Sequence, residues 1–345
     1  MYYTGIGRFG LVPFQITQSP DGYLHAPNDG QTIAASWNAL VNDSPADNIF
    51  PDNWLLNRLK NGDGFQSVDG GDIITASLEY AVNATVTSYS DTETISTTRQ
   101  DVFDRAEYSW KEYAGTVVQS ELENAINQGS ARKFDILGGK MKNLKNSFDR
   151  LLDVDMHSDG SGNSGKQIGG LQTLILSTPA VGTTGGINRA NFSFWRNQQT
   201  SGAKTTSAYD NLRAAWRTVY NNCSNGVAGE HPKFIETTQT VFEGYEGLLL
   251  ANERFTTKEQ ADGGFKNEVL KFKGAMVAYG PNCASGSAYF LNPQFIKLYY
   301  QKGHWYKAGE TVEPANATIK VFKAHTIANL GITNMRMLGI SNAIS

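Results

Sequence analysis

Three stretches of the sequence carry residues at spacings found in phosphate or metal sites. Residues 5–10 match the GxGxxG pattern of dinucleotide-binding loops, but that loop needs a helix directly after it, and here Pro13 follows. Residues 160–166 match GxxxxGK, the pattern of a phosphate-binding loop. The next residue is Gln167, where such a loop needs Ser or Thr to hold magnesium. We therefore interpret the second stretch as a glycine-rich connector and expect no bound cofactor.

The third stretch is an acidic series that resembles the start of a calcium-binding loop. It consists of Asp153, Asp155, His157 and Asp159. A calcium loop of this type needs Glu at its twelfth position, and the two registers place Ser164 or Lys166 there. The sequence therefore predicts no metal site, although it leaves open whether an ion binds the acidic segment 153–159.

The residue types used in catalysis form no recognisable pattern elsewhere in the sequence. The five histidines are scattered without HxxxH spacing, and Cys223 and Cys283 belong to no CxxC motif. The sequence contains no GxSxG motif and no pair of carboxylates in a recognisable context. We therefore expect that the protein is not an enzyme.

The element expected to organise the chain is a long amphipathic helix over residues 131–155. Its apolar residues recur at steps of three and four, which places them on one helix face. Charged residues fall mostly off that stripe, so the opposite face should be solvated. We expect the stripe to be buried and to support the fold. It comprises Phe134, Leu137, Met141, Leu144, Phe148 and Leu151.

The composition is typical of a globular chain, with a mean hydropathy of −0.38 and 40 % hydrophobic residues. Charged residues make up only 18 %, and 35 of the 345 residues are glycine, which favours a β-rich chain with many loops. A net charge of −3 indicates no basic field for sequence-specific nucleic-acid binding. The sequence has no run of eighteen apolar residues, so we expect no membrane association.

Two segments have few large apolar side chains that could form a core. Residues 1–50 are punctuated by prolines and are interpreted as an arm that lies on another surface. Residues 62–109 are rich in Thr, Val, Ile and Tyr, with strand-like runs at 73–78, 81–89 and 92–98. We expect a two-stranded flap there. An isolated two-stranded ribbon is marginally stable, so a partner should hold it.

The remaining segments mix helices and strands, which predicts an α/β (α+β mixed) fold. Ser120 and Glu123 form a capping-box pattern at the start of a short helix. The expected helices are 50–61, 121–128, 212–222 and 239–252. The expected strands are 108–118, 234–238, 269–276, 277–279, 288–291, 294–300 and two runs within 319–340.

The order of several short motifs is more informative than any one of them. The Thr-rich flap precedes Tyr108-Ser-Trp110-Lys111, and Val118-Gln-Ser-Glu-Leu-Glu-Asn124 follows. After the long helix come Asp159-Gly-Ser-Gly, Lys166-Gln-Ile-Gly-Gly-Leu171, a Thr-Gly-Gly-Ile loop, Phe194-Trp195-Arg196-Asn197 and Tyr289-Phe-Leu-Asn292-Pro. This series, from about residue 30 to the end, resembles a major capsid protein of tailed bacteriophages.

The resemblance implies the tailed-phage major capsid fold and a division of the chain into parts. It implies an N-terminal arm at 1–50 and an extended β-hairpin loop at 62–109. It implies an axial domain at 171–254 and 324–345. The peripheral domain would comprise 51–61, 110–170 and 255–323, with the spine helix 131–155. The expected structural and assembly residues are Trp110, Trp195 and the apolar stripe named above.

The resemblance also implies partners. The chain would assemble with itself, as hexamers and pentamers, into the icosahedral head of a double-stranded DNA phage, first in the host cytoplasm. The head would hold a portal and DNA packaged without sequence specificity. The sequence begins at Met1 without a fused assembly domain, so we expect a separate scaffolding protein. Some family members form a lysine–asparagine cross-link between subunits. We expect none here, because no lysine occurs between Lys60 and Lys111.

Three alternatives compete with this interpretation. An encapsulin-like shell protein of a cellular nanocompartment would have the same fold and would hold an enzyme as cargo. A surface adhesin could also be rich in Thr and Gly, but the first residues do not resemble a secretion signal. A glycan-acting enzyme needs two carboxylates at a fixed separation, and the sequence offers no such pair.

Overall fold

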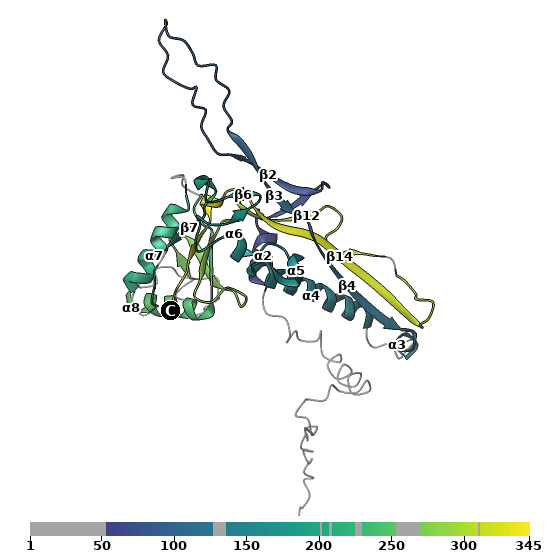
Figure 1. The fold of residues 1–345 in the computed structure, drawn as a ribbon. Coiled ribbons are helices and arrows are strands. Elements are labelled where there is room, and N and C mark those ends of the chain that lie inside the picture. Colours follow the sequence, from purple (N-terminus) through teal and green to yellow (C-terminus); the bar gives the residue numbers. More distant parts are fainter. Residues whose placement is uncertain are drawn as a thin grey trace, which may run out of the picture. The chain divides into compact units, whose positions relative to one another are not determined.

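The computed structural model describes residues 53–126, 136–200, 202–206, 209–224, 230–252, 270–309 and 311–345. Apart from residues 125 and 126, these residues belong to one unit, Ile49–Asn124 and Ile136–Ser345. The expected arm at 1–50 lies outside the described residues. Figure 1 shows that the unit combines sheets with helices, so the mixed α/β expectation is confirmed.

The first sheet is built around one long strand, β14 (Ile319–Ile332). Strand β4 (Lys111–Ser120) runs antiparallel to it, from Ile319 opposite Ser120 to Ala328 opposite Lys111. On its other side β14 pairs with β12 (Ile296–Gln301) and β13 (Lys307–Ala308), and β1 (Phe65–Val68) adds to β12 in parallel. The return strand expected at 108–118 is therefore confirmed from Lys111 onward, whereas Tyr108 and Ser109 belong to the preceding strand of the flap. Strand β1 belongs to this sheet rather than to the flap.

A long helix, α4 (Ile136–His157), packs against strand β4 of this sheet. The close approach depends on Gly115, because a Cβ atom there would lie 2.7 Å from Leu144 Cδ1 and 3.2 Å from the Phe148 ring. The helix confirms the expected spine, but it continues two residues further than predicted. The acidic series at 153–157 is therefore helical and not part of a loop.

The second sheet has six strands in the order β7-β15-β11-β8-β10-β9. These strands are β7 (Gln198–Thr200), β15 (Gly339–Ser341), β11 (Ala288–Leu291), β8 (Phe234–Thr237), β10 (Ala275–Tyr279) and β9 (Lys271–Phe272). Helices α7 (Tyr209–Asn222) and α8 (Gln239–Asn252) share one apolar core with the sheet, in which Trp216 contacts the rings of Tyr245, Phe272 and Phe290.

Sheet membership differs from the expected division into domains in two places. Residues 324–332 were expected with the axial segment 171–254, but they are the second half of β14 and belong to the first sheet. Conversely β9, β10 and β11 were expected in the peripheral domain, but they pair within the six-stranded sheet. Local sequence could not decide this, because strand pairing is a non-local property.

The flap is a hairpin of β2 (Ile73–Glu79) and β3 (Phe103–Ser109), paired from Ile73 opposite Ser109 to Glu79 opposite Phe103. Its two-stranded form is confirmed. The strands expected at 81–89 and 92–98 are wrong, because residues 80–102 form an irregular loop. Figure 1 shows this loop continuing beyond the paired strands.

Short elements complete the described unit. They are α2 (Trp54–Asn61), α3 (Glu121–Ile126), α5 (Gly162–Gly165), α6 (Leu171–Leu174), β5 (Thr183–Thr184), β6 (Ile187–Asn188), η2 (Ser193–Trp195) and η3 (Met335–Met337). The capping box at α3 is confirmed, since the Leu122 amide donates to Ser120 Oγ at 3.2 Å and the Ser120 amide donates to Glu123 Oε2 at 3.3 Å.

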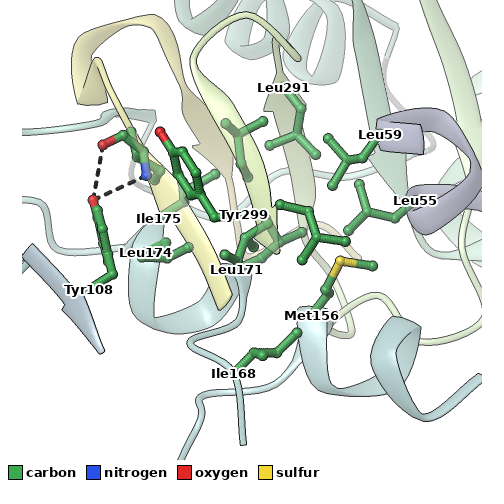
Figure 2. Close-up of a cluster of buried hydrophobic side chains, with 14 of the residues drawn as sticks. Leu55, Leu59, Tyr108, Met156, Ile168, Leu171, Leu174, Ile175, Leu291 and Tyr299 are labelled. Atoms are coloured by element: carbon green, nitrogen blue, oxygen red, sulfur yellow. Dashed lines mark hydrogen bonds between the residues drawn. The ribbon is translucent and has the colours of Figure 1, made fainter. Parts of the chain in front are cut away.

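The larger apolar core joins α2, α4, α6 and the first sheet. Figure 2 shows Leu55 and Leu59 of α2 facing Met156 of α4, with Leu171 and Leu174 of α6 beside them. These five side chains are at most 2 % exposed. No described helix is long and apolar enough to cross a membrane.

Candidate functional site

The most exposed apolar side chains of the described unit lie in the loop 80–102. Val82 is 90 % exposed and Val86 is 82 % exposed, and Tyr89 and Ile95 are also mostly in solvent. No residue between 80 and 102 is buried. Exposure of apolar area to water costs about 25 cal/mol per Å². Covering this loop with another surface would therefore lower the free energy of the protein.

The same loop has a negative charge. It contains Asp91, Glu93 and Asp101, and its one basic residue is Arg99. All four of these side chains are exposed. The complementary surface should therefore be apolar with basic residues at its margin.

The base of the flap, unlike its tip, is fixed to the rest of the unit. Ile74 and Leu78 of β2 and Tyr108 of β3 are buried in the main core. The Tyr108 hydroxyl donates to the Ile332 carbonyl at 3.0 Å and accepts from the Ile332 amide at 3.1 Å, as Figure 2 shows. The Tyr80 ring stacks on Phe194 with ring centroids 5.1 Å apart. The flap thus has a rigid base that sets the direction of its exposed loop.

The two tryptophans expected to matter both serve this support. The Trp110 indole N–H donates to the Gly71 carbonyl at 2.8 Å, which ties the β3–β4 junction to the segment before β2. Trp195 is 1 % exposed and donates to the Thr184 carbonyl at 2.9 Å. Both indole N–H groups are therefore used in hydrogen bonds within the described unit.

Sequence reasoning missed a buried arginine beside Trp195. Arg189 is 0 % exposed, and its Nε donates to Thr184 Oγ1 at 3.0 Å. Its Nη1 donates to Asn197 Oδ1 at 2.8 Å, and its Nη2 donates to the Leu174 carbonyl. Burial lowers the pKa of this guanidinium to about 10. The three acceptors lie on strand β5, on helix α6 and on the segment between η2 and β7, so Arg189 holds the Thr-Gly-Gly-Ile loop against the elements around it.

The apolar stripe of the spine helix is only partly where we expected it. Phe148 is 5 % exposed, and Met141 and Leu144 are half-buried. The prediction that Leu151 is buried is wrong, because this side chain is 46 % exposed. The next residue, Leu152, is fully buried instead. The helix buries a broader face near its end, where α2 and the six-stranded sheet also contact it. Phe134 lies outside the described residues, as does the side chain of Leu137.

A buried polar cluster forms at the C-terminal end of α4. Asp153, His157 and Glu236 are each at most 2 % exposed. His157 Nε2 lies 2.8 Å from Glu236 Oε1, and its Nδ1 lies 2.7 Å from the Asp153 carbonyl oxygen. A carbonyl and a carboxylate can only accept, so both ring nitrogens donate and the ring is cationic.

Burial and neighbouring charges shift the pKa values of His157 and Asp153. Burial would lower the pKa of His157, but the carboxylates of Glu236 and Asp153 outweigh burial and raise that pKa to about 9. Burial raises the pKa of Asp153, whose oxygens accept from the Leu56 amide and the Asn282 side chain. The cluster therefore joins α2, α4 and the strand β8 of the six-stranded sheet.

The remaining acidic residue of the helix end is also engaged within the protein. Asp155 accepts from the Tyr113 hydroxyl at 2.6 Å and from Gln167 Nε2 at 2.8 Å. Among the described residues, no group of three or more His, Cys, Asp or Glu side chains is arranged to hold a metal ion. Asp153, Asp155 and His157 of the acidic series therefore all make hydrogen bonds within the protein.

Comparison with known proteins gives matches only at the level of structure. No protein-family model matches the sequence, and no curated protein matches it. Among solved structures, the capsid of cyanophage A-1(L) matches with a TM-score of 0.66 and 16 % identity, covering 88 % of this chain and 95 % of that chain.

Two further structures match with similar coverage. The SrpI encapsulin complex from Synechococcus elongatus PCC 7942 has a TM-score of 0.58 and 10 % identity over 91 % of this chain and 95 % of that chain. The capsid of a native GTA particle has a TM-score of 0.58 and 12 % identity, with 91 % and 99 % coverage. The chain therefore has the major capsid fold that tailed bacteriophages share with encapsulins.

Proposed function

We propose that this protein is the major capsid protein of a tailed double-stranded DNA bacteriophage and that its role is structural. The observation that carries the proposal is the loop 80–102. A chain with the capsid fold holds a rigid hairpin base beneath a loop whose apolar side chains, such as Val82 and Val86, no described residue covers. The surface that covers such a loop in a shell is another copy of the chain.

Self-assembly follows from the form of this contact. The loop of one subunit and its docking surface on the next are different patches, so the contact is heterologous. Repetition of a heterologous contact around an axis produces closed rings, and hexamers and pentamers together close a shell. The location that follows is the phage head, after assembly in the host cytoplasm.

The proposal includes further partners. A shell of this kind is filled through a portal and needs a scaffold to set its curvature, which we propose is a separate protein. The content would be double-stranded DNA, held without sequence readout. The fold by itself is equally compatible with a protein cargo, so the content needs its own measurement.

An encapsulin-like shell is the second candidate, and the match to the SrpI encapsulin complex supports it. The two candidates differ in what the particle contains. Nuclease-resistant DNA in particles purified from the native source supports the phage head, whereas a stoichiometric enzyme in place of DNA supports the nanocompartment.

Negative-stain microscopy of the expressed full chain tests the assembly function. We expect closed shells, tubes or capsomers. A matched variant replaces residues 82–100 by a short Gly/Ser turn, which removes exposed residues and keeps both strands of the hairpin. It should stay folded by circular dichroism and should form no particles. A full chain that remains a monodisperse monomer contradicts the proposal, and so does a loop variant that assembles normally.

A further inference from the structure

One edge of the first sheet is a long strand that has no neighbour on its outer side among the described residues. Strand β4 pairs with β14 over its whole length and with no other described strand. In an antiparallel pair, every second residue directs its amide and its carbonyl away from the partner strand. The hydrogen bonds of β14 identify which residues of β4 these are.

Strand β14 uses alternate residues to bond on the side away from β4. Val321 exchanges two hydrogen bonds with Val312, and the Lys323 carbonyl accepts from the residue that follows β13. Their partners on β4 are Val118 and Thr116, so the backbone groups of these two residues point outward. The same alternation gives the whole outward series, which we call the β4 edge: Glu112, Ala114, Thr116 and Val118.

The β4 edge is exposed and almost without hydrogen bonds. Among the described residues, its four amides have no partner, and one of its four carbonyls, that of Val118, accepts from Lys140 Nζ at 3.1 Å. All four side chains are exposed. Natural edge strands are usually protected by charges, proline or a bulge. Residues 113–120 contain no charge and no proline, and their register with β14 is unbroken, so the β4 edge can accept a further strand.

The exposed loop 80–102 contains a run with the pattern of such a strand. Residues 82–87 are Val-Asn-Ala-Thr-Val-Thr, a strict alternation of apolar and polar side chains. They form no strand in the described chain, and Val82 and Val86 are 90 % and 82 % exposed. The one backbone hydrogen bond within the described run joins the Val86 amide to the Asn83 carbonyl at 3.3 Å. Little local structure is therefore lost if the run becomes a strand.

From this complementarity we propose that residues 82–87 of a second copy add a strand to the β4 edge. The inference rests on the proposed function and names the surface on which the loop docks. The loop of the same copy extends away from this edge. Strand β14 lies beside β4 as far as Lys111, and beyond that point Ile332 bonds the Tyr108 hydroxyl of the flap. Figure 1 shows the flap and β4 extending in different directions from their junction.

The charges of the two surfaces suit this pairing. The run 82–87 is uncharged, so it brings no charge against the uncharged part of β4. Strand β4 itself carries one cation and one carboxylate, Lys111 and Glu112. Lys323 lies on the adjacent strand and is exposed, which leaves an excess of positive charge beside the edge. The loop 80–102 has three carboxylates and one arginine, so its net charge is of the opposite sign.

Hydrogen exchange resolved to single residues tests the pairing in the full chain. In the monomer the amides of Ala114 and Thr116 should exchange rapidly, whereas those of Tyr113 and Gly115 should be protected by β14. In particles, exchange at Ala114 and Thr116 should slow by at least about tenfold, and so should exchange at alternate amides of residues 82–87. Unchanged exchange at Ala114 and Thr116 overturns the proposal. Protection of β4 without protection of residues 82–87 overturns the choice of partner.

Proline at an outward position tests the same contact through assembly. Thr116→Pro removes an amide that β14 does not use, so the monomer should keep the circular dichroism of the wild type and should form no particles. The matched control Thr116→Val keeps the amide and should assemble normally. Ala114→Pro repeats the test at a second position if Thr116→Pro fails to fold. Normal particles from a folded proline variant, or equal loss of particles in Thr116→Val, contradict the pairing.

Failure of this inference can be told from failure of the proposed function. Particles in which the β4 edge stays unprotected refute the pairing and leave the capsid function standing. A wild-type chain that forms no particles refutes the proposed function. The pairing is then measured by adding a peptide of residues 81–90 to the monomer. Slower exchange at Ala114 and Thr116 supports the pairing, and unchanged exchange at millimolar peptide overturns it.

Discussion

At the scale of single residues, the most consequential group is the buried histidine of the cluster at the end of α4. His157 links Asp153 and Glu236, and the second oxygen of Glu236, Oε2, has no hydrogen-bond partner among the described atoms. A buried charge cluster is seldom a large net source of stability, but removal of one member leaves the others uncompensated. The contact between α4 and strand β8 therefore depends on the protonation state of His157.

We predict that the stability of the unassembled chain falls as the pH rises. The pKa of His157 is about 9 in the folded chain and 6.5 ordinarily, so its stabilisation is complete below pH 6.5 and is lost as the pH rises through about 9. The difference corresponds to about 3 kcal/mol at most. Urea unfolding at pH 6.5 and at pH 9 measures it. In His157→Gln the pH dependence should be smaller by most of that amount, and identical dependence in the two proteins would contradict the assignment.

Three truncations on α4 separate the buried, half-buried and exposed residues of the apolar stripe. Phe148→Ala should lower the free energy of unfolding by about 3–5 kcal/mol, because the ring is buried against the sheet. Leu144→Ala should cost less, since that side chain is half-buried, and it should still impair assembly. Leu151→Ala should change stability by about 0.5 kcal/mol or less. Urea midpoints of the three variants decide the order, and an equal loss in Phe148→Ala and Leu151→Ala would refute this packing.

At the scale of elements, sequence pattern located most helices and strands but not their pairing. Helix 239–252 and strand 288–291 have the predicted bounds, because both are bounded by clear breaks in pattern. The runs 81–89 and 92–98 have the composition of strands, yet they form none. Thr and Val favour a pleated surface only where neighbours pack on it, and none of the residues 81–98 is buried.

The candidate site was harder to predict than the fold. Periodicity identified Phe148, but it could not show that Leu151 faces solvent, because two other elements widen the buried face near the helix end. Arg189 gave no local signal at all, since its acceptors Thr184, Asn197 and Leu174 converge only in the folded chain. A flap with little core of its own was expected from its composition, although its outer part was predicted as strands and is an irregular loop.

The flap loop should be the first site of proteolysis in the free chain. Arg99 lies in the exposed irregular loop, whereas Arg105 lies in β3 and pairs with Glu107 at 2.7 Å. Proteases need several residues of extended backbone, which the loop supplies. Limited trypsin digestion followed by mass spectrometry should show early cleavage after Arg99 in the monomer and protection in particles. Equal cleavage rates in the two states would mean that no neighbour covers the loop.

At the scale of the whole molecule, any shell built from this chain should be held by non-covalent contacts alone. A lysine–asparagine cross-link needs a lysine at the subunit contact, and the flap has none between Lys60 and Lys111. Particles boiled in denaturant should therefore run as one band at about the monomer mass of 37.7 kDa. A ladder of covalent oligomers would contradict this prediction.

The pairing of β14 with β4 has a mechanical consequence for any container built from this chain. Ten consecutive residues of each strand face one another, and their hydrogen bonds lie across the strand direction. A pull along the strands loads these bonds together in shear, whereas a pull at one end of the pair would break them in turn. We expect single-molecule pulling along β14 to need a clearly higher rupture force than peeling β4 away, so that pressure from within would be resisted best along this axis.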